Sequence, residues 1–370
     1  MGLIMLIKDL WRAFHFVCSV QFWRMVLLWN FSILLSYYRL FKASFSQKIV
    51  SYPRCSPSIT PFRPVCVITG ATSGLGLATA YELSKEGYVV VLVGRSQQLL
   101  SETIRKIKDR NGDAHLKAFE VDLASIESIM KFKTSLRQWL LDSDLHCSVQ
   151  ILINNAGILA TSPRVTAEGF DQMIGTNYIG AFVLTKLLLP LLESSLVSSK
   201  IVNVTSFTHR AVTGVQVNEG TVSGRRFLRS KQYPYARIYE YSKLCLLLFS
   251  YELHRQICLM EKSHQIFVTV ADPGIVQTNI MREFPAILSC LACSVLKRLR
   301  LLQSPECGIN SILDAALAPA GTSGAYFFGG KGRTINSSTL SRNAKLAREL
   351  WETTCNLLSV TPFAAQRNWC

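Results

Sequence analysis

The chain has 370 residues, of which 49% are hydrophobic, and its 40 basic and 24 acidic side chains give a formal net charge of +16. This length suits one large domain with an appended segment, and a mean hydropathy of +0.24 is high for a soluble protein. The positive charge does not indicate a nucleic-acid partner, because no basic nucleic-acid-binding module is recognisable.

Residues 1–47 form an apolar, aromatic leader in which scattered basic side chains accompany a single acid, Asp9. Such a balance favours an anionic membrane surface. The longest uncharged run, Met25–Tyr38, would span about 21 Å as a helix, which is less than the roughly 30 Å of a bilayer core. An extension back to Ala13 is long enough but includes Arg24. We therefore expect a membrane anchor, as an interfacial helix, a tilted span with a snorkelling Arg24, or a re-entrant hairpin.

Residues 48–64 contain four prolines and predict an extended linker. From residue 65 to 370 the pattern predicts a single doubly wound α/β domain, with helices on both faces of a parallel sheet. Apolar runs that predict buried strands alternate with helix-period segments. The strands are expected at 65–69, 88–93, 116–121, 149–153, 201–204 and 267–271, and helices between them include 97–110, 126–141 and 180–192.

A glycine-rich turn follows the first predicted strand and opens a helix. Gly70 permits the tight turn, while Gly74 and Gly76 let the backbone approach a pyrophosphate. Free N–H groups at the start of the helix then meet the phosphate oxygens. This pattern predicts a dinucleotide site at Gly70, Thr72, Ser73, Gly74, Leu75 and Gly76.

The end of the second strand decides the expected cofactor. NAD enzymes often place an acid there for the ribose 2′-hydroxyl, whereas this chain has Gly94 and Arg95. Arg95 can pair with a 2′-phosphate, so NADP(H) is favoured over NAD(H), with Arg95 as a plain surface residue the alternative.

Four further signals follow in order: the run Asn154–Gly157, then Asn177, Ser206, and the pair Tyr239 and Lys243. Residues four apart share a helix face, so the Tyr and Lys side chains can enter one pocket. Together with the glycine turn, over residues 64–326, these signals resemble the short-chain dehydrogenase/reductase family. Within the family the chain is most similar to the membrane-bound retinol-dehydrogenase-like and isoprenoid alcohol dehydrogenase members.

The resemblance implies the roles of four catalytic residues. Tyr239 acts as acid and base, and Lys243, with the charge of the oxidised nicotinamide, lowers its pKa from the usual value near 10. Lys243 also holds the nicotinamide ribose. Ser206 polarises the substrate carbonyl, and Asn177 holds a water beside the lysine.

The resemblance also extends the expected cofactor site. One group follows the third and fourth strands on the adenosine side, and another follows the sixth strand beside the carboxamide. These residues are Asp122, Leu123, Asn155, Ala156 and Gly157 in the first group and Pro273, Gly274 and Thr278 in the second. The dispersed histidines form no ligand spacing, and the reaction needs no metal.

Two segments depart from the regular alternation. The family's substrate lid falls at about residues 280–303, where the apolar run 284–296 precedes Lys297, Arg298 and Arg300. This lid is expected either to dip into a membrane or to form a buried helix with a solvated end. The long insert between Ser206 and Tyr239 is expected to be a mobile basic loop beside the substrate mouth.

These observations predict a membrane-associated NADP(H)-dependent oxidoreductase that interconverts a lipophilic alcohol and its aldehyde or ketone. Retinoid, polyprenoid, steroid and fatty aldehyde substrates all fit. The expected location is the endoplasmic reticulum membrane with the catalytic domain in the cytosol, or another organelle membrane such as a plastid envelope. A homodimer is compatible with the family. The alternative function is a non-catalytic NADP(H)-binding regulator or scaffold of a membrane complex.

Overall fold

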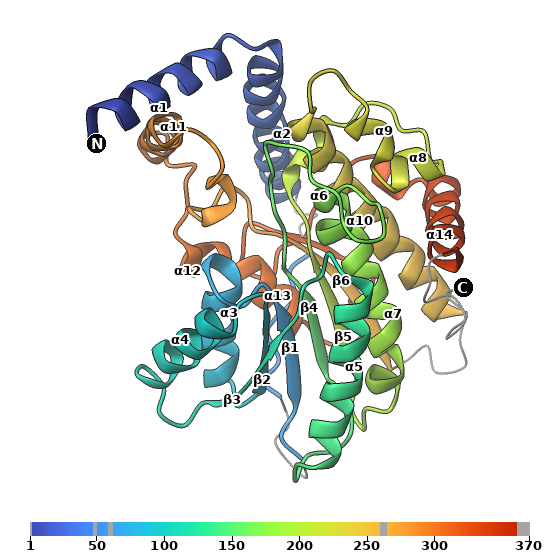
Figure 1. The fold of residues 1–370 in the computed structure, drawn as a ribbon. Coiled ribbons are helices and arrows are strands. Elements are labelled where there is room, and N and C mark those ends of the chain that lie inside the picture. The colour runs from blue at the N-terminus through green and yellow to red at the C-terminus, as the bar shows by residue number, and fades with distance from the viewer. Residues whose placement is uncertain (1, 47–49, 58–61, 260–264, 361–370) are drawn as a thin grey trace.

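The structure is a computed structural model, and it describes residues 2–46, 50–57, 62–259 and 265–360. Part of the expected linker and the last ten residues of the expected catalytic domain lie outside these ranges. The described chain places a leader of two helices against a three-layered α/β domain (Figure 1).

The central layer is a parallel seven-stranded sheet in the order β3-β2-β1-β4-β5-β6-β7. Its inner strands are fully buried because helices cover both faces, which explains their continuous apolar sequences. All six expected strands are present, with ends within two residues of the prediction. The additional strand β7 has only three residues, which is too short for a clear sequence pattern. The strands are β1 Val65–Thr69, β2 Val89–Gly94, β3 His115–Glu120, β4 Ile151–Asn154, β5 Ser199–Val204, β6 Ile266–Asp272 and β7 Tyr326–Phe328.

The core of the described residues has two large apolar clusters, one on each face of the sheet, and a smaller third cluster that joins α2 (Val20–Phe45) to β6 and β7. Helices α3, α4 and α13 pack on one face, whereas α5, α7 and α10 pack on the other, with α14 against α10 (Figure 1). The predicted doubly wound fold is therefore confirmed. The bounds are α3 Gly74–Lys85, α4 Gln97–Lys108, α5 Ile126–Leu141, α7 Gly180–Glu193, α10 Tyr235–Cys258, α13 Asn310–Leu317 and α14 Ala344–Ser359.

The leader consists of α1 Gly2–Val17 and α2 Val20–Phe45, bent by 70° at the break between them. Together they are long and apolar enough to cross a membrane; α7 with the turns before it also meets that test, but it is buried in the core. Helix α2 buries a stripe along one face and leaves its other face exposed. The buried stripe is Met25, Ser32, Ile33, Ser36 and Leu40, and the exposed large hydrophobic side chains are Val20, Trp23, Leu27, Phe31, Leu34, Tyr38, Phe41 and Phe45.

The lid contains α11 Ala286–Arg298, none of whose residues is buried. The expectation of a buried lid helix is therefore wrong, because α11 contacts α1 of the leader instead of entering the core (Figure 1). Leu291 and Leu299 are each at least 60% exposed, which gives this helix a free apolar surface.

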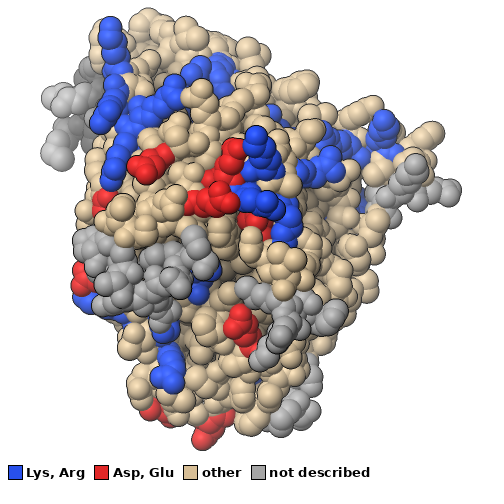
Figure 2. Space-filling model, turned by 90° about the vertical axis from the view of Figure 1, so that its right-hand side faces the viewer, with Lys and Arg blue, Asp and Glu red and all other residues tan. Residues whose placement is uncertain are grey.

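We expected the insert after Ser206 to be a mobile basic loop, and the structure shows helical turns within it. It forms the short helices η2 Phe207–Ala211, α8 Glu219–Val222 and α9 Arg225–Leu228, and α8 packs against α14. A capping box at Asn218 and the burial of Val222 fix this arrangement. Arg225, Arg226, Arg229 and Lys231 of the insert are exposed, whereas Arg210 is half-buried. Figure 2 shows basic side chains gathered on the upper half of the face that carries α8, α9 and α14.

Candidate active site

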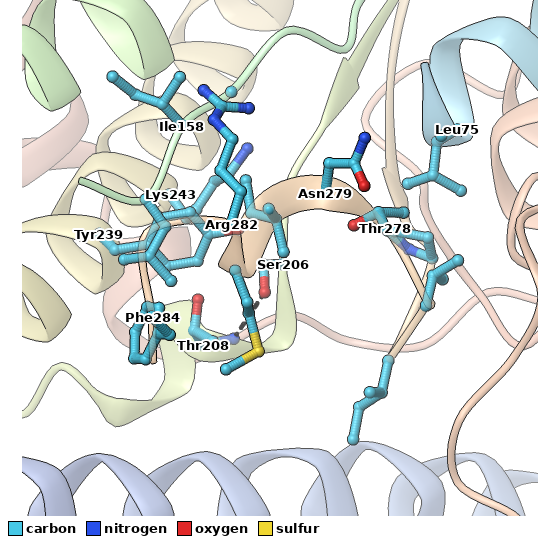
Figure 3. Close-up of a pocket in the computed structure, with 18 of the residues that line it drawn as sticks. Leu75, Ile158, Ser206, Thr208, Tyr239, Lys243, Thr278, Asn279, Arg282 and Phe284 are labelled. Carbon is cyan, nitrogen blue, oxygen red and sulfur yellow. Dashed lines mark hydrogen bonds between the residues drawn. The ribbon is translucent and has the colours of Figure 1, made fainter. Parts of the chain in front are cut away.

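A cavity of about 780 Å³ opens at the carboxyl ends of the strands. The strand order reverses between β1 and β4, which is where open α/β sheets bind their ligands. One end of the cavity is lined by the glycine turn and the ends of β2 and β4. The other end is lined by Ser206, Tyr239, Lys243, helix α11 and residues of α2, and the loop after β6 runs between the two ends (Figure 3).

The glycine turn has the geometry that the sequence predicts. Gly70 and Gly74 both have positive φ angles, of 65° and 52°. A Cβ on Gly76 would lie 2.2 Å from the carbonyl oxygen of Gly70, so only glycine allows the helix to pack this closely on the turn. Ser73 caps α3 without a side-chain hydrogen bond, so the first N–H groups of that helix remain for a ligand. Thr72, Ser73, Gly74, Leu75 and Gly76 all line the cavity.

The segment after β4 supports the glycine turn from the side. The side-chain amide of Asn155 donates to the carbonyl oxygen of Thr69 at 2.8 Å, and the N–H groups of Asn155 and Ala156 donate to the Thr69 hydroxyl at 3.0 Å. Asn155, Ala156 and Gly157 line the cavity, so all three predicted residues meet it.

Arg95 lies exposed at the cavity rim, one residue after β2. A Cβ on Gly94 would lie 2.9 Å from the Thr72 side chain, so a larger residue would crowd the turn. Leu123 lines the cavity but Asp122 does not; the Asp122 carboxylate accepts a hydrogen bond from the N–H of Ala124 at 2.9 Å. Because Asp122 does not line the cavity, its predicted contact with a cofactor is not supported by this geometry.

The loop after β6 completes the cofactor end of the cavity. Pro273, Gly274 and Thr278 line it as expected. A Cβ on Gly74 would lie 3.2 Å from the Thr278 side chain, which places this loop directly against the glycine turn.

Ser206, Tyr239 and Lys243 come together although they belong to two elements. Ser206 follows β5, while Tyr239 and Lys243 lie one turn apart on α10, and all three side chains are buried at the cavity (Figure 3). The Ser206 side chain lies close enough to Tyr239 to act on its pKa as a hydrogen-bonding group. Lys243 Nζ donates to the carbonyl oxygen of Val204 at 3.0 Å and lies 5.8 Å from the centre of the Tyr239 ring. Two buried hydroxyls beside an amine can hold a carbonyl oxygen and give it a proton.

Asn177 stands behind this group, in the π-helical turn Gly175–Ile179, and does not line the cavity. Its amide oxygen accepts from the N–H of Ile158 at 2.8 Å, and its nitrogen donates to the Ser242 hydroxyl at 3.0 Å. Ser242 in turn donates to the carbonyl oxygen of Tyr239 at 2.8 Å. A Cβ on Gly157 would lie 3.4 Å from Lys243 Nζ and 3.5 Å from the Asn177 oxygen, so these groups share one corner.

Burial controls the acidity of the central residues. It raises the pKa of Tyr239 above its ordinary value, against the effect of the Ser206 hydrogen bond, and the nearby Asp272 carboxylate raises it further. Burial lowers the pKa of Lys243 to about 8, and the Asp272 charge acts in the opposite direction. The protein's own groups therefore do not lower the pKa of Tyr239 as expected. The loss of solvent around the hydroxyl raises this pKa by more than the Ser206 side chain lowers it.

Asp272 is a site residue that the sequence reasoning missed. Its carboxylate accepts hydrogen bonds from the Tyr326 hydroxyl at 2.6 Å and from the N–H of Gly274 at 2.9 Å. It therefore ties β7 to the Pro273-Gly274 loop. An acid at the end of an apolar strand was the available signal, because a buried carboxylate needs several partners.

His209 is a second missed residue. The N–H of Ser338 donates to its Nε2 at 3.2 Å, so its Nδ1 carries the proton and donates to the carbonyl oxygen of Ser206 at 2.7 Å. Burial lowers the pKa of His209 to about 3, with help from the charge of Arg210. The imidazole is therefore neutral at physiological pH and holds the backbone of the Ser206 turn.

The leader also enters the site, which the sequence did not predict. Phe22, Met25, Val26 and Trp29 of α2 line the cavity. Arg24 is paired with Glu240 of α10 at 2.7 Å, so the expected alternative of a snorkelling arginine does not apply to this structure.

Comparison with known proteins agrees with this geometry. Residues 64–217 match the short chain dehydrogenase family. Polyprenol dehydrogenase from Homo sapiens is 33% identical over 82% of this chain and 88% of its own, and retinol dehydrogenase 11 from Homo sapiens is 30% identical over 85% and 92%. Among solved structures, an uncharacterized protein from Mycobacterium paratuberculosis is 26% identical, covers 81% of this chain and 94% of its own, and has a TM-score of 0.61.

Proposed function

The chain belongs to the short-chain dehydrogenase/reductase family and is an NAD(P)-dependent oxidoreductase of alcohols and carbonyl compounds; we propose that it acts on a lipophilic substrate, with NADP(H), at a membrane surface. The observation that carries the proposal is the composition of the cavity. The buried Ser206–Tyr239–Lys243 group lies at one end of a cavity that α2 and α11 line mainly with apolar side chains.

The residues at the cofactor end fit a dinucleotide. Gly76 has no space for a Cβ, so the start of α3 packs close against the turn, and its first N–H groups are free for a phosphate. Arg95, with no acid beside it, would hold a 2′-phosphate, and this supports NADP(H). Bound NADPH would supply the hydride for reduction of the carbonyl carbon.

The protein's own part in the reaction is proton transfer. We assign Ser206 to hold the carbonyl oxygen by a hydrogen bond, which stabilises the negative charge that develops there. Tyr239, protonated at neutral pH because burial raises its pKa, then gives its proton to that oxygen. Lys243 and Asn177 stand next to it as the path by which the tyrosine regains a proton.

Exposed apolar surfaces support the membrane part of the proposal. Trp11 and Phe14 of α1 are more than 60% exposed, as is Leu291 of α11, and the two helices contact each other. The basic side chains of Lys297 and Arg298 in the last turn of α11, and of Arg300 just after it, are exposed. Such a surface suits a leader and lid that lie in the headgroup region, so that an isoprenoid alcohol, as the relatives' names suggest, enters from the bilayer. We place the protein at the endoplasmic reticulum, with an organelle envelope the alternative.

The test is turnover by the detergent-solubilised full-length protein. Retinal, a long polyprenal, a steroid ketone and a fatty aldehyde are each assayed with NADPH and NADH. Tyr239→Phe should lose roughly 100-fold or more of the activity while it retains NADPH affinity. The control is Tyr241→Phe on the same helix, because Tyr241 does not line the cavity. Tight NADPH binding without turnover of any substrate would instead support a regulator or scaffold.

A further inference from the structure

We infer that helix α2 is a wall of the active site, held there by Glu240, and that Trp29 is a specificity-determining residue beside Tyr239. This inference rests on the proposed function for its substrate. It gives the leader a task in selecting the alcohol, in addition to any attachment to a membrane.

Glu240 is the anchor of this wall. It follows Tyr239 in α10 and is only 1% exposed. Both of its oxygens are held by Arg24, at 3.0 and 2.7 Å, and Trp29 Nε1 donates to one of them at 2.8 Å. Burial of a carboxylate is unfavourable without such partners. The two hydrogen bonds from Arg24 on α2 therefore compensate for the burial of Glu240 next to Tyr239.

Trp29 is the point at which the wall reaches the reacting groups. Its ring centre lies 5.8 Å from that of Tyr239, with the planes inclined by 45°. The hydrogen bond to Glu240 fixes the orientation of the indole. Phe22, Met25 and Val26 precede it at helical spacing and also line the cavity, so one stripe of α2 faces the substrate path.

The remainder of α2 is attached farther along the domain. Arg210 Nε donates to the Ser36 hydroxyl at 2.9 Å, and Arg39 donates to the carbonyl oxygens of Asn336 and Ser337 at 2.9 and 2.7 Å. Because Arg210 lies in η2, just after Ser206, α2 contacts both elements that carry the catalytic side chains. These attachments make α2 a fixed wall.

The lid extends this wall with further aromatic side chains. Phe284 lines the cavity, and its ring centre is 5.1 Å from that of Phe16 in α1, which in turn lies 5.8 Å from that of Phe22 in the α2 stripe. A substrate that reaches Tyr239 therefore meets one aromatic surface to which the lid and the Trp29 stripe both contribute. The size of residue 29 should decide how bulky the alcohol may be next to its reacting carbon.

The selectivity test compares Trp29→Ala, Trp29→Phe and Phe31→Ala in the full-length protein. Phe31 is the matched control because it is 65% exposed on α2 and does not line the cavity. Aldehydes that are either unbranched or bulky next to the carbonyl are assayed with NADPH. Trp29→Ala should change the ratio of their kcat/KM values at least 10-fold in favour of the bulky aldehyde, Trp29→Phe less, and Phe31→Ala under 2-fold. An unchanged ratio in Trp29→Ala would overturn the inference for Trp29.

A second test needs no turnover, so its outcome is separate from that of the proposed function. Arg24→Met leaves the Glu240 carboxylate buried and unpaired, and should lower the Tm by at least about 4 °C. Adding Glu240→Gln to Arg24→Met should recover most of that loss. Purely additive Tm changes would mean that Glu240 does not hold α2. If the wild type showed no turnover but the Tm changes of Arg24→Met and Glu240→Gln were still non-additive, the proposed function would be overturned, whereas the attachment of α2 through Glu240 would stand.

Discussion

Acidification should destabilise this protein through His209, which the fold keeps neutral. The imidazole is fully enclosed, with both nitrogens bonded, to the Ser206 carbonyl and the Ser338 N–H. Arg210 and Arg39 add positive charge nearby, and the Tyr326 ring lies 5.7 Å away. A protonated imidazole would lose its bond from Ser338 and face these guanidinium groups.

The size of the effect follows from the two pKa values. The pKa of His209 is about 3 in the folded chain against 6.5 for a free imidazole. Below pH 6.5 the unfolded chain therefore binds a proton that the folded chain does not, and stability falls with pH until about pH 3. Between pH 6.5 and 4.5 this linkage amounts to roughly 2–3 kcal/mol.

The assay is the free energy of unfolding by urea in detergent at pH 4.5, 5.5, 6.5 and 7.5, for the wild type and His209→Asn. Asparagine can also donate and accept a hydrogen bond but does not titrate. The wild type should lose about 2–3 kcal/mol more than the variant over the acidic range. An equal acid loss in both proteins would refute the assignment of a buried neutral His209.

Three further changes test the cofactor end and the buried acid. Gly76→Ala places a Cβ 2.2 Å from the Gly70 carbonyl oxygen, so the unfolding free energy should fall by about 1–3 kcal/mol and NADPH binding should weaken in a fluorescence titration. If Gly76→Ala kept the wild-type unfolding free energy and NADPH affinity, the close packing of Gly76 on Gly70 would be contradicted. Arg95→Ser should raise the KM for NADPH roughly 10- to 100-fold and spare that for NADH, and equal changes would argue against a 2′-phosphate contact. Asp272→Asn removes a charge that raises the pKa of Lys243, so the alkaline fall of kcat/KM should move to lower pH, whereas a shift to higher pH would exclude this coupling.

The sequence alone determined the elements that depend on neighbours along the chain. Apolar runs predicted six of the strands. Five of them are buried throughout, and a strand covered on both faces must be apolar, whereas the edge strand β3 is half-buried. The glycine turn was predictable because Gly70 and Gly74 need left-handed backbone and Gly76 has no space for a Cβ. The pairing of Tyr239 and Lys243 followed from helical periodicity. The family resemblance then supplied Ser206, which the structure places beside them.

Only the tertiary structure decided how distant segments complete the site. The insert became short helices because Val222 could be buried against the domain, and α11 stayed on the surface because it contacts the leader. Glu240 and Arg24 are 216 residues apart, and no pattern in the sequence predicts that they pair. A buried charge or imidazole is recognisable only when its partners and its loss of solvent are known. For that reason, the roles of Asp272, His209 and helix α2 could be recognised only from the packing of the structure.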